Sequence, residues 1–203
     1  MRKIAVIHGG HAPHYRTFNE PKFNQYIEKL IYQRDFQESD LEGIDVLIVP
    51  SQLHLETLLS IEPAINRFAD KGGIVVAFGP QPKQWLPKQN WELRETNFWW
   101  WLEEGADSGL RMVAPNYPLF RDGHLNESAC TWHQHGVFHL EEGMESLIDM
   151  KDGGSLMYVD KVNTAGTWIV TTLDPDFHYG SYFMPATEKF LDGFFPWLAN
   201  GEI

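Results

Sequence analysis

Residues Asp45 to Phe78 (DVLIVPSQLHLETLLSIEPAINRFADKGGIVVAF) carry the strongest indication of the fold. The segment begins with a short apolar run, Asp45 to Pro50, and ends with a second one, Ile74 to Phe78. Uninterrupted runs of this kind are typical of strands buried on both faces of a parallel sheet. The apolar spacing between them predicts a helix over Leu58 to Lys71 that is stopped by Gly72-Gly73. This order predicts two parallel strands joined by a right-handed crossover.

The same alternation extends toward the amino terminus. Lys3 to Ile7 (KIAVI) fits a further buried strand, and a glycine pair follows it. The cap and proline signals at 19–21 predict a helix that continues to residue 31. Its apolar positions are Phe23, Ile27, Leu30 and Ile31. A weaker strand pattern covers 31–36. We therefore expect an α/β fold with a mostly parallel central sheet and helices on both faces.

The second half of the chain has a different pattern. Residues 82–127 hold many prolines, a tryptophan-rich piece and little periodicity, so we expect an irregular insertion packed over one edge of the sheet. Strand-like runs at 155–160 and 167–173, separated by a glycine-containing turn, predict an antiparallel hairpin. Aromatic residues on one face predict a helix near Pro185 to Leu198. We expect residues 1–203 to form a single domain.

The composition limits the classes of molecule that the protein can be expected to bind. The 203 residues carry a formal net charge of −12, so the chain offers no basic surface for nucleic acid or for an anionic membrane. The single cysteine, Cys130, excludes an intrachain disulfide framework. The sequence shows no signal-peptide pattern and no apolar segment of membrane length. We therefore expect a cytoplasmic protein whose partner is a small polar metabolite, with homo-oligomerisation left open.

Most of the chemically capable residues follow the carboxyl ends of the expected strands. Loops at this edge of a parallel sheet meet helix amino termini and bind the ligands of open α/β folds. These residues are His8, His11 and His14 in IHGGHAPHY, Gln52 and His54 after DVLIVP, Gln81 after IVVAF, and Asp174, Asp176 and His178 after TWIVTTL. The sequence therefore predicts a pocket at this edge.

Four motifs, IHGGHAPHY, DVLIVPSQLH, FADKGGIVVAFGPQ and TWIVTTLDPDFH, resemble in their order the class I glutamine amidotransferase-like superfamily. Within it, the chain is most similar to the trehalose-utilisation (ThuA-like) branch, whose first loop is likewise rich in glycine and histidine. The resemblance covers roughly residues 3–80 and 128–198. It implies a flavodoxin-like three-layer sandwich that binds a small polar metabolite, such as a carbohydrate derivative, at the carboxyl edge of the sheet.

In this sequence, other residues stand where the resemblance implies the nucleophile and the base of the amidotransferases. The resemblance implies a cysteine in the tight turn after IVVAF, but this turn reads Gly79-Pro80-Gln81. The histidine and glutamate implied after the last strand are replaced by Asp174-Pro175-Asp176. A glutamine side chain cannot become a thiolate, and Cys130 lies far from this turn in the sequence. We therefore expect no cysteine-dependent glutaminase activity.

The histidines of the first loop leave several roles open. His8, His11 and His14 fit a glycine-rich turn, the wall of a pocket, or a metal site completed by His54 and His178. Their spacing matches no strong zinc signature, and no thiolate joins them. We therefore expect no cofactor and no tightly bound metal ion.

A second histidine cluster lies in CTWHQHGVFH, residues 130–139. Its pattern predicts a strand with His133 and His135 on one face, which suits an exposed edge strand, metal ligation or the binding of a polar ligand. Asp174 fits a turn before a proline, or a pair of carboxylates with Asp176. The candidate catalytic acid–base residues are His133, His135, Asp176 and His178. The candidate ligand-binding residues are His11, His14, Gln52, His54 and Gln81.

The sequence does not decide whether the protein is an enzyme. The first hypothesis for its function is binding of a small polar metabolite, with acid–base chemistry if the protein is catalytic. The alternatives are a non-catalytic binding or oligomeric scaffold protein with a degenerate site, and a metal-dependent hydrolase. The aromatic run NFWWW, residues 97–101, fits core packing of the insertion, a subunit interface, or stacking on a sugar ring or base.

Overall fold

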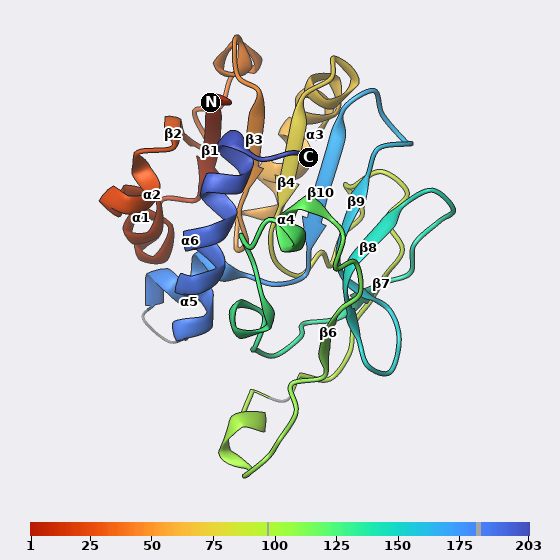
Figure 1. The fold of residues 1–203 in the computed structure, drawn as a ribbon. Coiled ribbons are helices and arrows are strands. Elements are labelled where there is room, and N and C mark those ends of the chain that lie inside the picture. Colours follow the sequence, from red (N-terminus) through yellow and green to blue (C-terminus); the bar gives the residue numbers. More distant parts are fainter. Residues whose placement is uncertain (97, 182–183) are drawn as a thin grey trace.

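Figure 1 shows the computed structural model of the chain, which describes residues 1–96, 98–181 and 184–203. The strands are β1 (Ile4–His8), β2 (Ile27–Tyr32), β3 (Val46–Val49), β4 (Ile74–Ala77), β5 (Trp91–Glu92), β6 (Leu110–Met112), β7 (Val137–Phe138), β8 (Glu145–Met150), β9 (Ser155–Asp160) and β10 (Thr167–Thr171). The helices are α1 (Ala12–Asn19), α2 (Pro21–Asn24), α3 (Leu55–Asp70), α4 (Pro118–Arg121), α5 (Pro175–Ser181) and α6 (Pro185–Asn200). Short 3-10 turns are η1 (Glu38–Leu41), η2 (Trp100–Leu102) and η3 (Glu127–Ala129).

The strands of the described residues join into one sheet in the order β2-β1-β3-β4-β10-β9-β7-β5, with β8 pairing β9 and β6. The pairs from β2 to β10 are parallel, and those from β10 onward are antiparallel. The parallel half therefore ends at β10, so the carboxyl ends of β1, β3, β4 and β10 share one edge.

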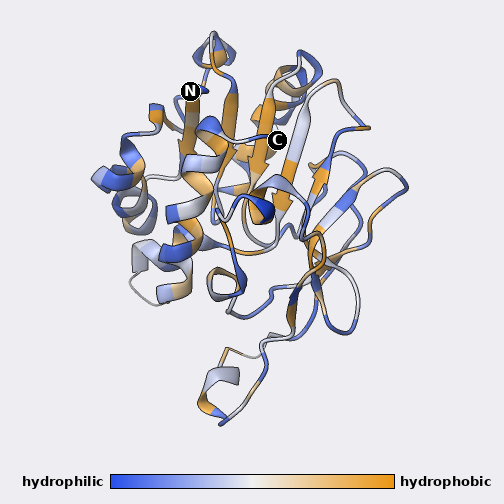
Figure 2. Ribbon diagram, in the orientation of Figure 1, coloured by the Kyte–Doolittle hydropathy of each residue, from blue (hydrophilic) through white to orange (hydrophobic). Residues whose placement is uncertain are grey.

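Both faces of the parallel half are buried, which explains the uninterrupted apolar runs (Figure 2). Val6 and Ile48 belong to the core that packs beneath α6, together with aromatic residues of that helix. Leu47 and Ala77 belong to the opposite core, which α3 covers. Side chains alternate between the faces of a strand, so apolar residues are needed at every position. This arrangement confirms the predicted three-layer α/β fold.

The predicted helix from Asn19 to Ile31 is wrong. The chain forms α1 and α2 before residue 25, and Ile27–Tyr32 is strand β2, with Leu30 opposite Val6 of β1. The apolar spacing of this segment was ambiguous, because a short strand at a sheet edge buries few of its side chains. The weak strand pattern at 31–36 is also wrong beyond Tyr32, where β2 ends.

The second half follows the sequence more closely. β9 and β10 form the predicted antiparallel hairpin, and α6 covers the predicted carboxyl-terminal helix. Residues 82–127 are largely irregular, but β5 and β6 inside this segment pair with β7 and β8. The predicted strand at 130–139 is reduced to β7, because residues 131–136 take an irregular path with Gly136 at φ 136°.

A helix that crosses a membrane needs about 20 consecutive, mostly apolar residues. Within residues 1–96, 98–181 and 184–203, no helix is both long and apolar enough to do so.

Candidate functional site

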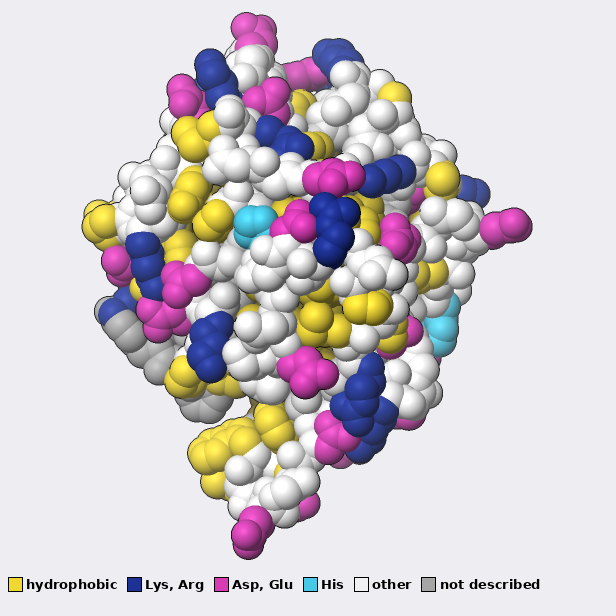
Figure 3. All heavy atoms as spheres, in the orientation of Figure 1, with side chains coloured by type: hydrophobic (Ala, Val, Ile, Leu, Met, Phe, Trp, Pro, Cys, Tyr) yellow, Lys and Arg dark blue, Asp and Glu magenta, His cyan; other side chains and the backbone are white. Residues whose placement is uncertain are grey.

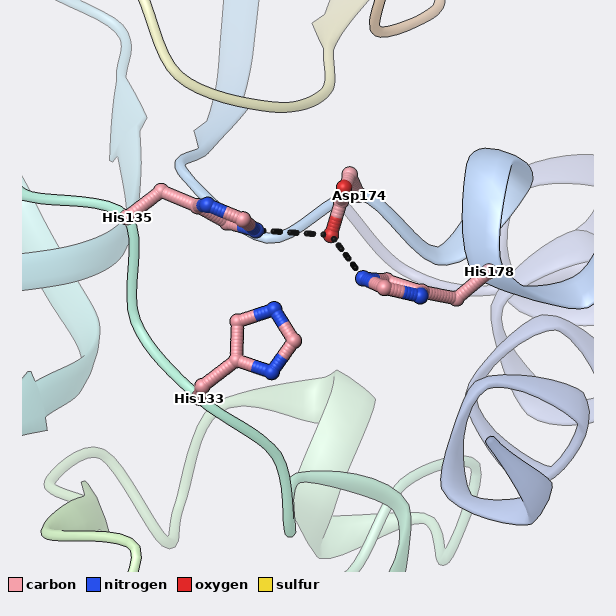
Figure 4. A group of neighbouring side chains, drawn as sticks. All are labelled: His133, His135, Asp174 and His178. Atoms are coloured by element: carbon pink, nitrogen blue, oxygen red, sulfur yellow. Dashed lines mark hydrogen bonds and ion pairs between the residues drawn. The ribbon is translucent and has the colours of Figure 1, made fainter. Parts of the chain in front are cut away.

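Four side chains of the kinds that bind metals meet beyond the carboxyl end of β10 (Figure 4). They are His133, His135, Asp174 and His178, and their ligand atoms all lie within 4.8 Å of one another. Asp174 Oδ1 lies 3.1 Å from His135 Nε2 and 3.3 Å from His178 Nε2. Figure 4 shows the ring of His133 turned toward the same point. We call this group the His/Asp centre.

Three segments supply the His/Asp centre. Asp174 follows β10 by three residues, in the loop that leaves the carboxyl end of that strand. His178 lies on α5, and its backbone N–H donates to the Asp174 carbonyl at 3.2 Å. A spacing of four residues across a helical turn puts these two side chains on one side. His133 and His135 come from the irregular segment between η3 and β7.

The His/Asp centre is largely closed to solvent. The side chains of Asp174 and His178 are 3% and 9% exposed, and that of His135 is 15% exposed. Burial, with repulsion from His135 and His178, lowers the pKa of His133 to about 3. Burial also lowers the pKa of His178, against the attraction of Asp174. Near neutral pH both rings are therefore uncharged, and each has one ring nitrogen without a proton.

His133 lacks a partner for one of its nitrogens. No hydrogen-bond partner within the described chain reaches His133 Nε2, although this atom is buried. The ring of Phe98 covers His133 edge-on, with 4.7 Å between the ring centroids, and lies 6.1 Å from the ring of His135. Leaving a buried polar atom unsatisfied costs about 1–3 kcal/mol. His133 Nε2 therefore keeps hydrogen-bonding capacity that the described residues do not use.

A second buried cluster joins the loops after β1 and β3 to α5. Asp176 Oδ2 accepts hydrogen bonds from the backbone N–H of Ser51 at 3.1 Å and from its Oγ at 2.9 Å. His14 Nε2 lies 3.2 Å from the same oxygen, and both side chains are fully buried. The N–H of Gly9 donates to His14 Nδ1 at 3.0 Å, which assigns the proton of a neutral His14 to Nε2. Asp176 therefore fastens α5 to the sheet edge.

The remaining residues of the first loops lie around this second cluster. The ring of His11 stacks on His14 at 3.8 Å between centroids and hydrogen-bonds to the Gln52 backbone. Gln52 has φ 57°, a left-handed conformation that is uncommon outside glycine, and its side chain is exposed. His54 is exposed at the start of α3, with Nδ1 3.1 Å from Thr57 Oγ1. His8 stacks on Tyr32 with 5.5 Å between centroids.

The turn after β4 is the one at which the resemblance implies a nucleophile, and Gln81 stabilises it internally. Its Nε2 donates to the carbonyls of Phe78 and Gly79 at 3.2 and 3.0 Å, and its Oε1 accepts from Trp85 Nε1 at 2.6 Å. A Cβ at Gly79 would lie 2.6 Å from that of Ser51 and 3.8 Å from that of Asp174. The turn therefore touches both polar clusters but offers them no nucleophile.

Cys130 is expected to be unreactive in the folded protein. Its side chain is buried, and burial raises the pKa of the thiol to about 12, so almost none of it is thiolate at neutral pH. Labelling with a disulfide reagent at pH 7.5 should stay below about 5% over an hour and become complete in guanidinium. Fast labelling of the folded chain would show that Cys130 is accessible and reopen its role as a nucleophile.

The structure brings together His133, His135 and His178, three of the four candidate catalytic residues. It places the fourth, Asp176, in the second cluster, and Asp174 takes its position in the His/Asp centre. The sequence favoured a turn role for Asp174 because a proline follows it, and the turn leaves its carboxylate free to point at the histidines. Of the candidate ligand-binding residues, His11 and His14 border Asp176, whereas Gln52 and His54 are exposed.

The arrangement of strands, helices and loops defines the fold class. A parallel half-sheet with helices on both faces, a tight glycine turn after β4 and polar loops at the carboxyl edge belong to the glutamine amidotransferase-like and ThuA-like fold. No family model matches the sequence, and no curated protein matches it either.

Solved structures support this assignment. A GMP synthase-like protein from Thermoplasma acidophilum is 12% identical, with a TM-score of 0.57 over 98% of this chain and 96% of that chain. A ThuA-like protein from Bacteroides uniformis is 12% identical, with a TM-score of 0.53 over 95% and 89%. A cytoplasmic protein from Salmonella typhimurium is 9% identical, with a TM-score of 0.56 over 97% and 98%. At these identities the likeness shows the fold alone.

Proposed function

We propose that this protein binds a small polar metabolite at the carboxyl edge of its sheet and has no cysteine-dependent glutaminase activity. The observation that carries the proposal is the His/Asp centre, where three imidazoles and one carboxylate converge beyond β10. Ligands of open α/β folds bind at this edge. The turn that holds the nucleophile of the amidotransferases packs beside Asp174, and it presents Gly79 and Gln81 instead of a cysteine.

The His/Asp centre favours a ligand rich in hydroxyl groups. His133 Nε2 is buried without a hydrogen-bond partner among the described residues, and the Asp174 carboxylate lies beside it. A hydroxyl group both donates and accepts, so one compound with several hydroxyls can satisfy an imidazole nitrogen and a carboxylate oxygen. A carbohydrate derivative has this character, and the resemblance to the ThuA-like branch favours the same class.

The centre acts through imidazoles rather than through a covalent nucleophile. His133 and His178 are neutral near pH 7 and offer lone pairs to a proton or to an electrophile. Asp174 fixes the orientation of His135 and His178 through its contacts with their Nε2 atoms. Asp176 is held by Ser51 and His14, so in this proposal it positions α5.

The test is ligand-observed NMR with a panel of sugars, sugar acids and polyols. At least one compound should show saturation transfer with the wild-type protein, and the signal should fall at least tenfold with His133→Ala. His139→Ala is the matched control, since His139 is half exposed and bonds to Glu92 outside the centre. If no compound binds, or if His133→Ala binds as the wild type does, the proposal is wrong.

A second function, oligomeric scaffold, is favoured by one feature. Residues 98–102, the aromatic arm, extend away from the sheet and carry four largely exposed apolar side chains (Figure 3). Their exposed fractions are 46% for Phe98, 60% for Trp99, 52% for Trp101 and 62% for Leu102. Exposed aromatic clusters of this kind are common at subunit interfaces. Asn97, which begins the NFWWW run, lies outside the described residues.

If the aromatic arm joins two copies, the purified protein is expected to be a dimer or larger at about 50 µM, and Trp101→Ser should weaken the self-association by about tenfold or more. Light scattering coupled to size exclusion measures this. Val162→Ser is the control, because Val162 is 56% exposed but lies in the β9–β10 turn. A wild-type monomer at this concentration would rule out the scaffold function.

A further inference from the structure

We infer that His133, His135, Asp174 and His178 bind one divalent first-row transition-metal ion. The inference rests on the proposed function, because it names the chemistry of the same centre. It also revises the expectation of a metal-free protein. That expectation rested on the first loop, His54 and the Asp176/His178 segment, whereas the structure joins His178 to Asp174 and to the 130–136 segment.

The first argument is the geometry of the donors. Three imidazole nitrogens and one carboxylate oxygen lie within 4.8 Å of one another, and the rings surround the carboxylate in Figure 4. Two ligands on one ion at about 2.1 Å each are at most about 4.2 Å apart. The widest pair therefore has to close by at least about 0.6 Å, and by about 1.4 Å at tetrahedral angles, through rotation of the side chains.

The second argument is the unsatisfied nitrogen of His133. Its residue is 3% exposed, and no hydrogen-bond partner within the described chain reaches Nε2. Asp174 Oδ1, meanwhile, is approached by both His135 and His178. One carboxylate oxygen cannot serve three imidazoles at once, but an ion placed among the four side chains would be coordinated by all of them.

The third argument concerns which ion fits. Imidazole and carboxylate together suit zinc, iron, nickel, cobalt or manganese, and the absence of a thiolate from this set disfavours the soft ion Cu(I). Four protein ligands complete a tetrahedral zinc site, whereas a six-coordinate ion keeps two positions for water or for a hydroxylated metabolite. The partial exposure of His135, 15%, gives access to such positions.

A bound ion would change the chemistry available to the centre. The imidazoles would act as ligands, and the ion would polarise a ligand oxygen or lower the pKa of a bound water toward 7. The metal-dependent hydrolase, one alternative in the sequence, would then be the leading activity. Phe98, packed on His133, would cover the ion from one side.

The experiment uses full-length protein prepared without a histidine tag. Elemental analysis of the purified chain should find about one transition-metal ion per chain. After chelation and dialysis, titration with Co²⁺, followed by its visible absorption, and calorimetry with Zn²⁺ and Mn²⁺ should show one site. His133→Ala and Asp174→Ala should each lower the affinity for the most tightly bound of these ions by more than about 100-fold. Even the loss of an outer-shell partner lowers metal affinity 10–100-fold. His139→Ala should bind as the wild type does.

Two results would overturn the inference: wild-type protein that binds none of these ions at 1 mM, or variants His133→Ala and Asp174→Ala that bind as tightly as the wild type. If the alanine variants fail to fold by circular dichroism, His133→Gln and the imidazole ¹⁵N spectrum of the wild type take their place. Zinc should then shift the signals of three histidines, and an unchanged spectrum would overturn the inference. Metabolite binding without metal binding refutes only this inference, and metal binding without any metabolite refutes only the proposed function.

Discussion

Asp176→Ala is expected to lower the free energy of unfolding by about 3–5 kcal/mol. The substitution removes the acceptor of two hydrogen bonds from Ser51 and leaves His14 Nε2 facing a void in a fully buried site. Buried donors without an acceptor cost about 1–3 kcal/mol each. Because Asp176 fastens α5 to the loops after β1 and β3, the loss should also loosen the helix that carries His178.

Urea denaturation followed by circular dichroism measures the change. Asp192→Ala is the matched control, since Asp192 of α6 forms a partly exposed ion pair with Lys22 of α2, and such pairs contribute about 0–1 kcal/mol. Asp176→Asn should lie between the two, because the amide keeps an oxygen for Ser51. A loss below about 1 kcal/mol for Asp176→Ala would mean that the second cluster does not hold α5.

The second large effect is the loss of folding stability on acidification. Protonation of His133 in the unfolded chain is expected to account for much of this loss. The pKa of His133 is about 3 in the folded chain and about 6.5 when the chain is unfolded. Between these pH values His133 is protonated in the unfolded chain but not in the folded chain. The free energy of unfolding therefore falls as the pH falls from 6.5 toward 3. Above pH 6.5 the contribution is fully present. The linkage relation gives an upper bound of about 5 kcal/mol for this single group.

Denaturation curves at pH 7.5, 6.5, 5.5 and 4.5 in a chelating buffer test this prediction for the metal-free protein. His133 faces His135, His178 and Asp174, and the pKa of His178 is lowered too, so the slope should become shallower but not vanish in His133→Gln. Equal slopes in wild type and His133→Gln would show that His133 is solvated in solution.

The turn after β4, Gly79-Pro80-Gln81, shows that this fold does not by itself imply cysteine-dependent chemistry. The tight turn at Gly79 is kept and still touches Ser51 and Asp174. Its glutamine, however, is bound to the turn's own carbonyls and to Trp85. The turn therefore packs beside the His/Asp centre and offers it no nucleophile.

Much of the fold was predictable because its signals are local. The runs at 45–50 and 74–78 are apolar at nearly every position, and a strand buried on both faces requires this. Leu58 and Ile65, on one face of α3, meet that sheet directly. The first helix was misassigned where the signal was weak: β2 is an edge strand, and its partly exposed residues leave no clear period.

The position of the His/Asp centre and its three histidines could be predicted from the sequence, but not which carboxylate joins them. His178 follows β10 closely, so the rule for carboxyl edges locates it. His133 and His135 were chosen as a pair on a strand, yet they reach Asp174 from an irregular segment whose path no periodicity encodes. Asp174 and Asp176 are two residues apart, and nothing in the sequence tells which carboxylate faces which cluster.

The α/β fold, the edge where the polar residues collect and the absence of a cysteine from the turn after β4 all follow from the amino-acid sequence, because burial patterns and residue identities are properties of short segments. The placement of Asp174 with the histidines, and of Asp176 with Ser51 and His14, depends instead on the packing of distant segments. Which carboxylate joins which cluster depends on how α5 packs against α1. A Cβ at Gly180 would lie 2.2 Å from the carbonyl oxygen of Pro13, so α5 approaches α1 as closely as a glycine allows. The resulting close packing directs the two carboxylates into different clusters.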